Sequence, residues 1–179
     1  QNDLGDETLE KALAANDPAA AACPEGTLSA HQKAQAALCA QAVDFLAVLA
    51  QAAKRVEYKL PQPLFARGRF EMNFFLAKFV AHHPVAKNGT GSPPRTPVTK
   101  LRSELRDLLR RIDRLPAVLC HRDYHRRNLM VTRRGGKPQL VIIDHQDTRL
   151  GPAGYDLASF LFDSYGTFPP ARRRALAKR

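Results

Sequence analysis

The chain has 179 residues, 44% of them hydrophobic and 25% charged, which is ordinary for a soluble globular protein with one core. Its net charge of +11 is unevenly spread: residues 1–60 hold 5 basic and 8 acidic side chains, and residues 61–179 hold 23 and 9. No long uncharged apolar run favours a membrane span, and the start of the chain is polar and acidic, unlike a signal peptide. We therefore expect a protein without membrane contact.

The cysteines argue for a reducing compartment. Cys23, Cys39 and Cys120 are an odd number at wide spacings, so neither a disulfide framework nor a four-cysteine zinc site is favoured. Cys39 lies in an alanine-rich stretch and Cys120 ends an apolar run, and both fit as small core residues. We expect a cytoplasmic protein.

The first half of the chain predicts helices. Residues 6–15 form a short helix that Asp6 can cap. Residues 29–59 form a long helix with Ser29 as its cap, and prolines at 61 and 63 end it. Its predicted core face shares helical spacing and consists of Ala34, Leu38, Phe45, Leu49 and Ala53.

Two further helices flank a loop. Residues 70–81 predict a helix whose apolar stripe faces the core, namely Phe70, Phe74, Ala77 and Phe79. Residues 84–97 contain four prolines and two glycines and predict an exposed, flexible internal loop rather than a domain boundary. Residues 98–114 predict a basic amphipathic helix with a buried stripe of Leu101, Leu105, Leu108 and Ile112.

The pattern then changes to short strands. Residues 117–120, 129–131 and 139–143 are apolar runs, and Arg134-Gly135-Gly136-Lys137 between the last two predicts a hairpin turn. Helices are expected again over 155–165 and 171–179. The predicted fold class is therefore α+β, mainly α, with a small β hairpin and one domain over residues 1–179.

Polar side chains suited to phosphoryl transfer lie at the ends of these strands. Such a reaction needs a carboxylate that orients the attacking hydroxyl and accepts its proton, and it needs oxygen ligands for Mg²⁺. Asp123 suits the first role. Asn128, five residues later, can turn back to a metal that Asp144 also holds. The spacing H-x-D-x-x-x-x-N, a hairpin, then an Asp after an apolar strand is typical of kinase catalytic and metal-binding loops.

Less specific interpretations of the same residues carry less weight. Three loop-capping polar groups without a ligand would be an expensive arrangement. His121 and His125 are four residues apart, but a zinc pair of the H-E-x-x-H type would need a glutamate and a helix here.

The segment from His121 to Phe162 resembles the aminoglycoside phosphotransferase and choline kinase family. It is most similar to bacterial kinases that phosphorylate the anomeric hydroxyl of N-acetylmuramic acid or N-acetylglucosamine, through H-R-D-Y-H-x-x-N-L-M, I-D-x-Q-D and G-P-x-x-Y-D-L-A-S. Residues 2–6 resemble the hinge that follows the small lobe in that group, and residues 70–75 resemble its helix near the substrate cleft.

The resemblance implies a site and cofactors. It implies Asp123 as catalytic base, Asn128 and Asp144 as Mg²⁺ and nucleotide ligands, and ATP or GTP as co-substrate. It implies that His121 and Asp156 brace the loop. Glu71 is a candidate contact to the substrate, and Asp147 faces either the sugar or the loop.

The chain also departs from the family pattern. His145 stands where Phe or Trp usually follows the metal-binding Asp. The glycine-rich loop and nucleotide-binding Lys of the N-terminal lobe have no counterpart, so residues 1–179 are expected to be the protein-kinase-like C-terminal lobe, completed in cis or in trans. This fragment alone is then expected to be of uncertain activity.

Other functions stay open at this point. Aminoglycosides and choline-like alcohols are alternative substrates that require the same residues. A kinase-like remnant without activity is another alternative. The basic second part could bind nucleic acid, although residues 98–114 lack interleaved aromatic side chains and no nucleic-acid-binding signature is present.

Overall fold

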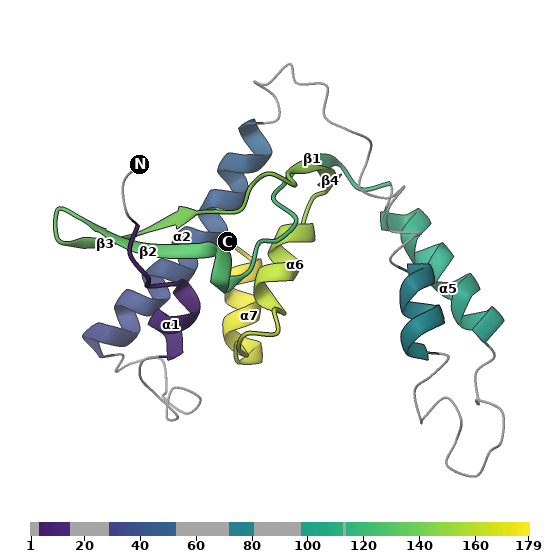
Figure 1. Cartoon of the computed structure of the whole chain (residues 1–179), viewed down its shortest axis with the longest axis horizontal. Helices are drawn as coiled ribbons and strands as arrows, with labels where there is room; N and C mark the ends of the chain where they lie inside the picture. Colours follow the sequence, from purple (N-terminus) through teal and green to yellow (C-terminus); the bar gives the residue numbers. More distant parts are fainter. Residues whose placement is uncertain (1–3, 15–28, 53–71, 81–97, 113) are drawn as a thin grey trace, which may run out of the picture.

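The computed structural model describes residues 4–14, 29–52, 72–80, 98–112 and 114–179. In this part of the chain, helices dominate and two small antiparallel sheets of two strands each lie among them (Figure 1). The predicted mainly helical α+β architecture with a small β hairpin is confirmed in this part of the chain. The expected loop over 84–97 lies outside the described residues.

The two N-terminal helices begin at side-chain caps. Helix α1 spans Leu9–Ala14, and Thr8 rather than Asp6 is its cap, since Thr8 Oγ1 accepts the Lys11 N–H at 3.3 Å. Helix α2 spans Ala30–Ala52. As predicted, Ser29 caps it: Ser29 Oγ accepts the Gln32 N–H, and Gln32 Oε1 accepts the Ser29 N–H. This reciprocal pair is a capping box.

Helix α2 is the central core helix. Its buried residues include Leu38, Cys39 and Val43, and it contacts α1, β1, β3, α6 and α7. With a hydropathy of 1.3 it is long and apolar enough to cross a membrane, so the expectation that no window would qualify is wrong. Lys33 and Asp44 interrupt its apolar sequence. Within the structure 28% of the apolar window is buried, and Leu38, Cys39 and Val43 on its inward side belong to the hydrophobic core.

The predicted hairpin is confirmed and is longer than its apolar runs. Strand β2 spans Leu129–Arg134, β3 spans Lys137–Ile142, and they pair antiparallel from Leu129↔Ile142 to Arg134↔Lys137. Gly135 and Gly136 form the turn with φ of 58° and 76°, the left-handed conformation that a type I′ turn requires. The N-terminal segment joins the other edge of β2 through the Val131 N–H, which donates to the Glu7 carbonyl.

The second sheet contains one strand that the sequence did not predict. Strand β1, Ala117–Cys120, was predicted, but its partner β4, Arg149–Pro152, was not. Helix α6 follows at Tyr155–Leu161, shorter than the predicted 155–165. Helix α7 spans Pro170–Ala177.

The remaining helices pack mainly on each other. Residues 72–75 are helical and continue as the π-helix η1, Leu76–Val80, which contacts α5, Val98–Ile112 (Figure 1). Leu76 is buried, whereas Phe74 is 57% exposed. In α5, Leu108 is 48% exposed. The predicted burial of both stripes is therefore wrong at these positions, because spacing shows that a face is apolar but not what covers it.

Candidate active site

The candidate site is built on the loop between β1 and β2, residues 121–128, called the 121–128 loop below. Asp123 is exposed near its start. At its end, the 3₁₀ turn η3, Arg126–Asn128, leads directly into β2. The Asn128 side-chain amide donates to the Asp123 backbone carbonyl at 2.9 Å, so the side chain predicted for metal binding is tied across the loop to the backbone of the residue predicted for catalysis. This bond also leaves Asn128 Oδ1 as a carbonyl-type acceptor.

The hairpin brings Asp144 next to Asn128. The Ile143 N–H donates to the Asn128 carbonyl at 3.0 Å, which extends the β2–β3 ladder by one position. Asp144 follows immediately, exposed and with a left-handed φ of 66°. One of its carboxylate oxygens accepts a hydrogen bond from the Gln146 amide.

Asp156 and His121 hold the start of the loop. The buried carboxylate of Asp156, on α6, accepts the backbone N–H of His121 at 2.6 Å and that of Arg122 at 2.9 Å. Burial raises the pKa of Asp156, and the two hydrogen bonds oppose this shift. The His121 ring is buried too, and its Nε2 donates to the Ile143 carbonyl at 2.9 Å. The loop is thus tied to α6 on one side and to the end of β3 on the other.

The backbone is strained at two places in this site. Among the described residues, Arg122, with φ of 81°, and Asp144 are the non-glycine residues with positive φ. Each directly borders or carries a predicted functional side chain. Such conformations cost of order 1 kcal/mol or more and persist at functional sites where the surroundings hold them.

Asp147 lies between two arginines rather than free. Its Oδ1 is 3.8 Å from Arg122 Nη1 and 3.8 Å from Arg149 Nη2. Of the two roles considered for Asp147, this position favours a contact to the loop.

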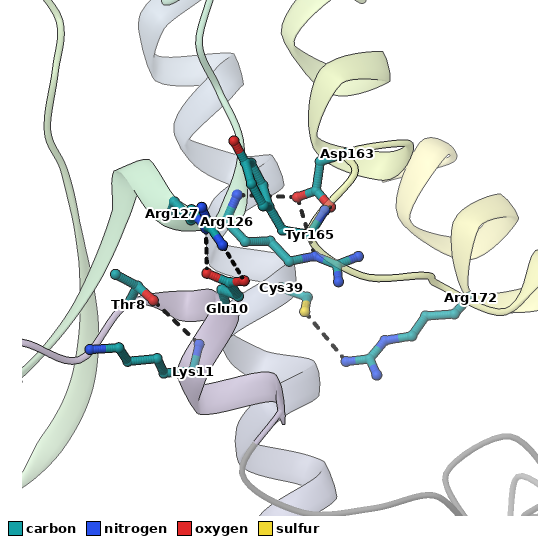
Figure 2. Close-up of polar contacts among 9 residues, drawn as sticks. All are labelled: Thr8, Glu10, Lys11, Cys39, Arg126, Arg127, Asp163, Tyr165 and Arg172. Carbon is teal, nitrogen blue, oxygen red and sulfur yellow. Dashed lines mark hydrogen bonds and ion pairs between the residues drawn. The ribbon is translucent and has the colours of Figure 1, made fainter.

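Sequence reasoning missed the contacts that hold the second part of the loop (Figure 2). Arg126 is buried. Its backbone N–H donates to Asp163 Oδ2, and its side-chain Nε lies 3.4 Å from the same oxygen. The Arg127 guanidinium lies 4.1 Å from the Tyr165 ring centroid and binds Glu10 through two hydrogen bonds of 2.7 and 3.2 Å. Asp163 lies just after the end of α6, outside the helical pattern, and no spacing in the sequence indicates its contact with Arg126.

A model of the phosphotransferase enzyme family matches residues 15–179. The chain belongs to the phosphotransferase enzyme family. The matched region contains the whole 121–128 loop, the hairpin and α6.

Several relatives of this family member carry the name N-acetylmuramate/N-acetylglucosamine kinase. The protein from Caulobacter vibrioides is 38% identical over 63 residues, 35% of this chain and 17% of the relative. That from Neisseria meningitidis is 48% identical over 50 residues, 28% and 14% respectively, and that from Pseudomonas putida is 40% identical over 57 residues, 32% and 16%. The matches thus span less than a fifth of these relatives.

Membership of the phosphotransferase enzyme family implies ATP and usually Mg²⁺, and the donor set fits such an ion. Mg²⁺ prefers carboxylate and amide oxygens and keeps several waters, so two protein ligands suffice. The exposed Asp144 carboxylate and Asn128 Oδ1 are of this type and lie on neighbouring backbone positions. Among the described residues, no group of three or more His, Cys, Asp or Glu side chains could hold a metal.

The other candidates are placed as follows. Glu71 lies outside the described residues. His145 is exposed, and its carbonyl accepts the Thr148 hydroxyl and N–H in a turn. The ring of His121 faces Ile143, whereas that of His125 packs on Tyr165 at 4.9 Å between centroids, so the two histidines point to different partners.

Proposed function

We propose that this chain carries the phosphoryl-transfer site of a small-molecule kinase whose substrate is an amino sugar of the N-acetylmuramate or N-acetylglucosamine type. The single observation that carries the proposal is the bond between the Asn128 amide and the Asp123 carbonyl, in a loop whose other end pairs with the backbone beside Asp144. The names of the relatives support the choice of sugar, and family membership supports the reaction class.

In the proposed reaction, the exposed Asp123 carboxylate orients a sugar hydroxyl and accepts its proton. The hydroxyl oxygen forms a bond to the γ-phosphorus, and the bond from that phosphorus to the β,γ-bridging oxygen breaks, which leaves a sugar phosphate and a nucleoside diphosphate. Asn128 Oδ1 and Asp144 would hold Mg²⁺, which supplies charge neutralisation at the phosphates when bound. Asp156 and His121 keep the loop in its strained conformation.

Several of the excess arginines pair with acidic or aromatic side chains of the same chain. Arg127 pairs with Glu10 and Arg179 with Asp44, and Arg173 stacks on the Phe162 ring at 4.8 Å. These contacts favour structural roles for the basic residues over a nucleic-acid surface. A cytoplasmic location is part of the proposal, since the phosphate donor is a nucleotide.

The test combines calorimetry and turnover. ATP binding is measured with and without Mg²⁺ on this chain and on a version extended upstream. Phosphorylation is then assayed with N-acetylmuramate, N-acetylglucosamine, an aminoglycoside and choline. We expect Mg²⁺-dependent binding and phosphate transfer to the amino sugars, abolished by Asp123→Asn with the melting temperature retained. Transfer to choline or an aminoglycoside instead would overturn the substrate, and retained turnover in Asp123→Asn would overturn the base.

A further inference from the structure

Two separate sets of contacts hold the 121–128 loop. The function proposed above gives a role only to the first set, which involves Asp156 and His121. Asp156 holds the backbone N–H groups of residues 121 and 122. Residues 125–127, which lie between Asp123 and Asn128, have a second set of partners on α1 and on the segment that joins α6 to α7.

The Tyr165 ring is the centre of this second set. The His125 ring meets it edge to face, at 4.9 Å between centroids and 64° between planes, and the Arg127 guanidinium lies 4.1 Å from its centroid. Alternate residues of the loop thus contact one ring, a favourable arrangement for a cation over an aromatic face. Figure 2 shows Tyr165 beside Arg127 and Asp163.

Both ends of this set are anchored. Glu10 on α1 accepts two hydrogen bonds from the Arg127 guanidinium, a fork geometry that fixes the plane of the group. Asp163 Oδ1 accepts the Tyr165 N–H at 3.2 Å while its Oδ2 accepts the Arg126 N–H. The Asp163 side chain is only 2% exposed. The ring therefore stands at a defined place relative to the loop backbone.

We propose that Tyr165 is a positioning residue for phosphoryl transfer: its ring, by holding residues 125 and 127, keeps Asp123 aligned with Asn128. The His125 backbone links the two, because its N–H donates to the Asp123 carbonyl and its carbonyl accepts the Asn128 N–H, both at 3.0 Å. A shift of the His125 backbone therefore moves both Asp123 and Asn128. The activity part of this inference rests on the proposed kinase function.

Tyr165→Leu removes the ring and its contacts, and Tyr165→Phe keeps them. Among the hydrogen bonds described for this part of the chain, none uses the Tyr165 hydroxyl, so Phe should restore the clamp. Phe162→Leu is a matched control, because it removes an arginine–aromatic contact that does not touch the loop. Arg127→Lys is a second test, since it keeps the charge but loses the planar fork.

The first readout is amide hydrogen exchange of this chain, which needs no activity. Tyr165→Leu and Arg127→Lys should speed exchange at the Arg126 and Asn128 amides by about tenfold, the range expected for losing ring contacts of this kind. Tyr165→Phe and Phe162→Leu should leave both amides unchanged, and hairpin amides should stay protected in all variants. Unchanged exchange in Tyr165→Leu, or equal acceleration in Tyr165→Phe, would overturn the clamp.

The second readout is turnover with MgATP and N-acetylmuramate. Tyr165→Leu should lower kcat about tenfold or more with KM little changed, because alignment of reacting groups rather than substrate binding is lost. A rise in KM with kcat unchanged would overturn the positioning role. If the wild type transfers no phosphate to any acceptor, the proposed function fails, and the exchange measurement still decides whether the clamp exists.

Discussion

Replacing Asp156 tests how the loop is held. Its carboxylate is buried and accepts two backbone N–H groups, at 2.6 and 2.9 Å. Asp156→Ala removes both acceptors and leaves the N–H groups of His121 and Arg122 without their partner. Asp156→Asn retains one acceptor oxygen and places an NH₂ group against the other N–H.

The magnitude follows from these contacts. Hydrogen bonds to charged groups contribute about 1.5–3 kcal/mol each, and burial, which raises the pKa of Asp156, offsets part of that gain. We expect Asp156→Ala to lower the free energy of unfolding by about 3–4 kcal/mol and Asp156→Asn by about 1–2 kcal/mol. The strained Arg122 backbone should relax in both variants, because its N–H loses or weakens its acceptor.

Urea unfolding monitored by circular dichroism measures both variants. Asp147→Asn is the matched control, because it makes the same chemical change in a carboxylate that meets the loop only through ion pairs of 3.8 Å; it should cost less than about 1 kcal/mol. If Asp156→Ala were as stable as Asp147→Asn, the two short hydrogen bonds would not be holding the loop, and the reasoning would be refuted.

The pH dependence gives an independent check of Asp156. Because its pKa is raised above 3.8 in the folded protein, the folded state binds a proton more readily than the unfolded state. The stability of the wild type relative to Asp156→Asn should therefore be greatest at low pH and decline as the pH rises from 3.8 through the raised pKa. An advantage that grows with pH would show that the hydrogen bonds, not burial, dominate.

Three further substitutions have distinct expected outcomes. Asp144→Ala and Asp144→Gly should both remove Mg²⁺-dependent ATP binding in calorimetry. The Asp144→Gly variant should nevertheless be about 1 kcal/mol more stable to urea than Asp144→Ala, because the backbone φ at this position is 66°. Equal stability of the two variants would contradict the backbone strain. Gly166→Ala would place its Cβ 1.9 Å from Arg126 Nη1. Because Arg126 is buried, we expect the free energy of unfolding in urea to fall by about 1–3 kcal/mol. An unchanged urea midpoint would show that the Arg126 side chain moves aside without cost. Tyr124→Phe removes a buried hydroxyl that donates to the Ala42 carbonyl at 2.6 Å and should cost about 1 kcal/mol, seen as a lower Tm; an unchanged Tm would mean that this bond adds nothing.

Local signals in the sequence were sufficient to predict the hairpin, the start of α2 and part of the core around the site. Gly135-Gly136 predicted the hairpin because few other residues adopt two successive left-handed conformations. Ser29 predicted the start of α2 because its side chain satisfies a free helical N–H. Cys39 and Cys120 were expected in the core and are buried.

Long-range contacts could not be predicted in this way. Strand β4 contains Gly151 and Pro152, which weaken any strand pattern, and it forms only because β1 offers it a pairing edge. The contact of Tyr165 with His125 depends on how the chain returns after α6, which no spacing encodes. The exposure of Leu108 likewise depends on what covers α5, not on the periodicity of α5 itself.

The order in which this chain leaves the ribosome gives α2 an unusual risk. The helix is synthesised before β3, α6 and α7, which it packs against, and the Tyr124–Ala42 hydrogen bond spans 82 residues. During translation, the apolar surface of α2 therefore stays exposed to solvent until these partners are made. This surface is as hydrophobic as that of a candidate membrane span. We expect nascent chains stopped before the hairpin to be captured by chaperones or to aggregate, and release past residue 177 to end this exposure.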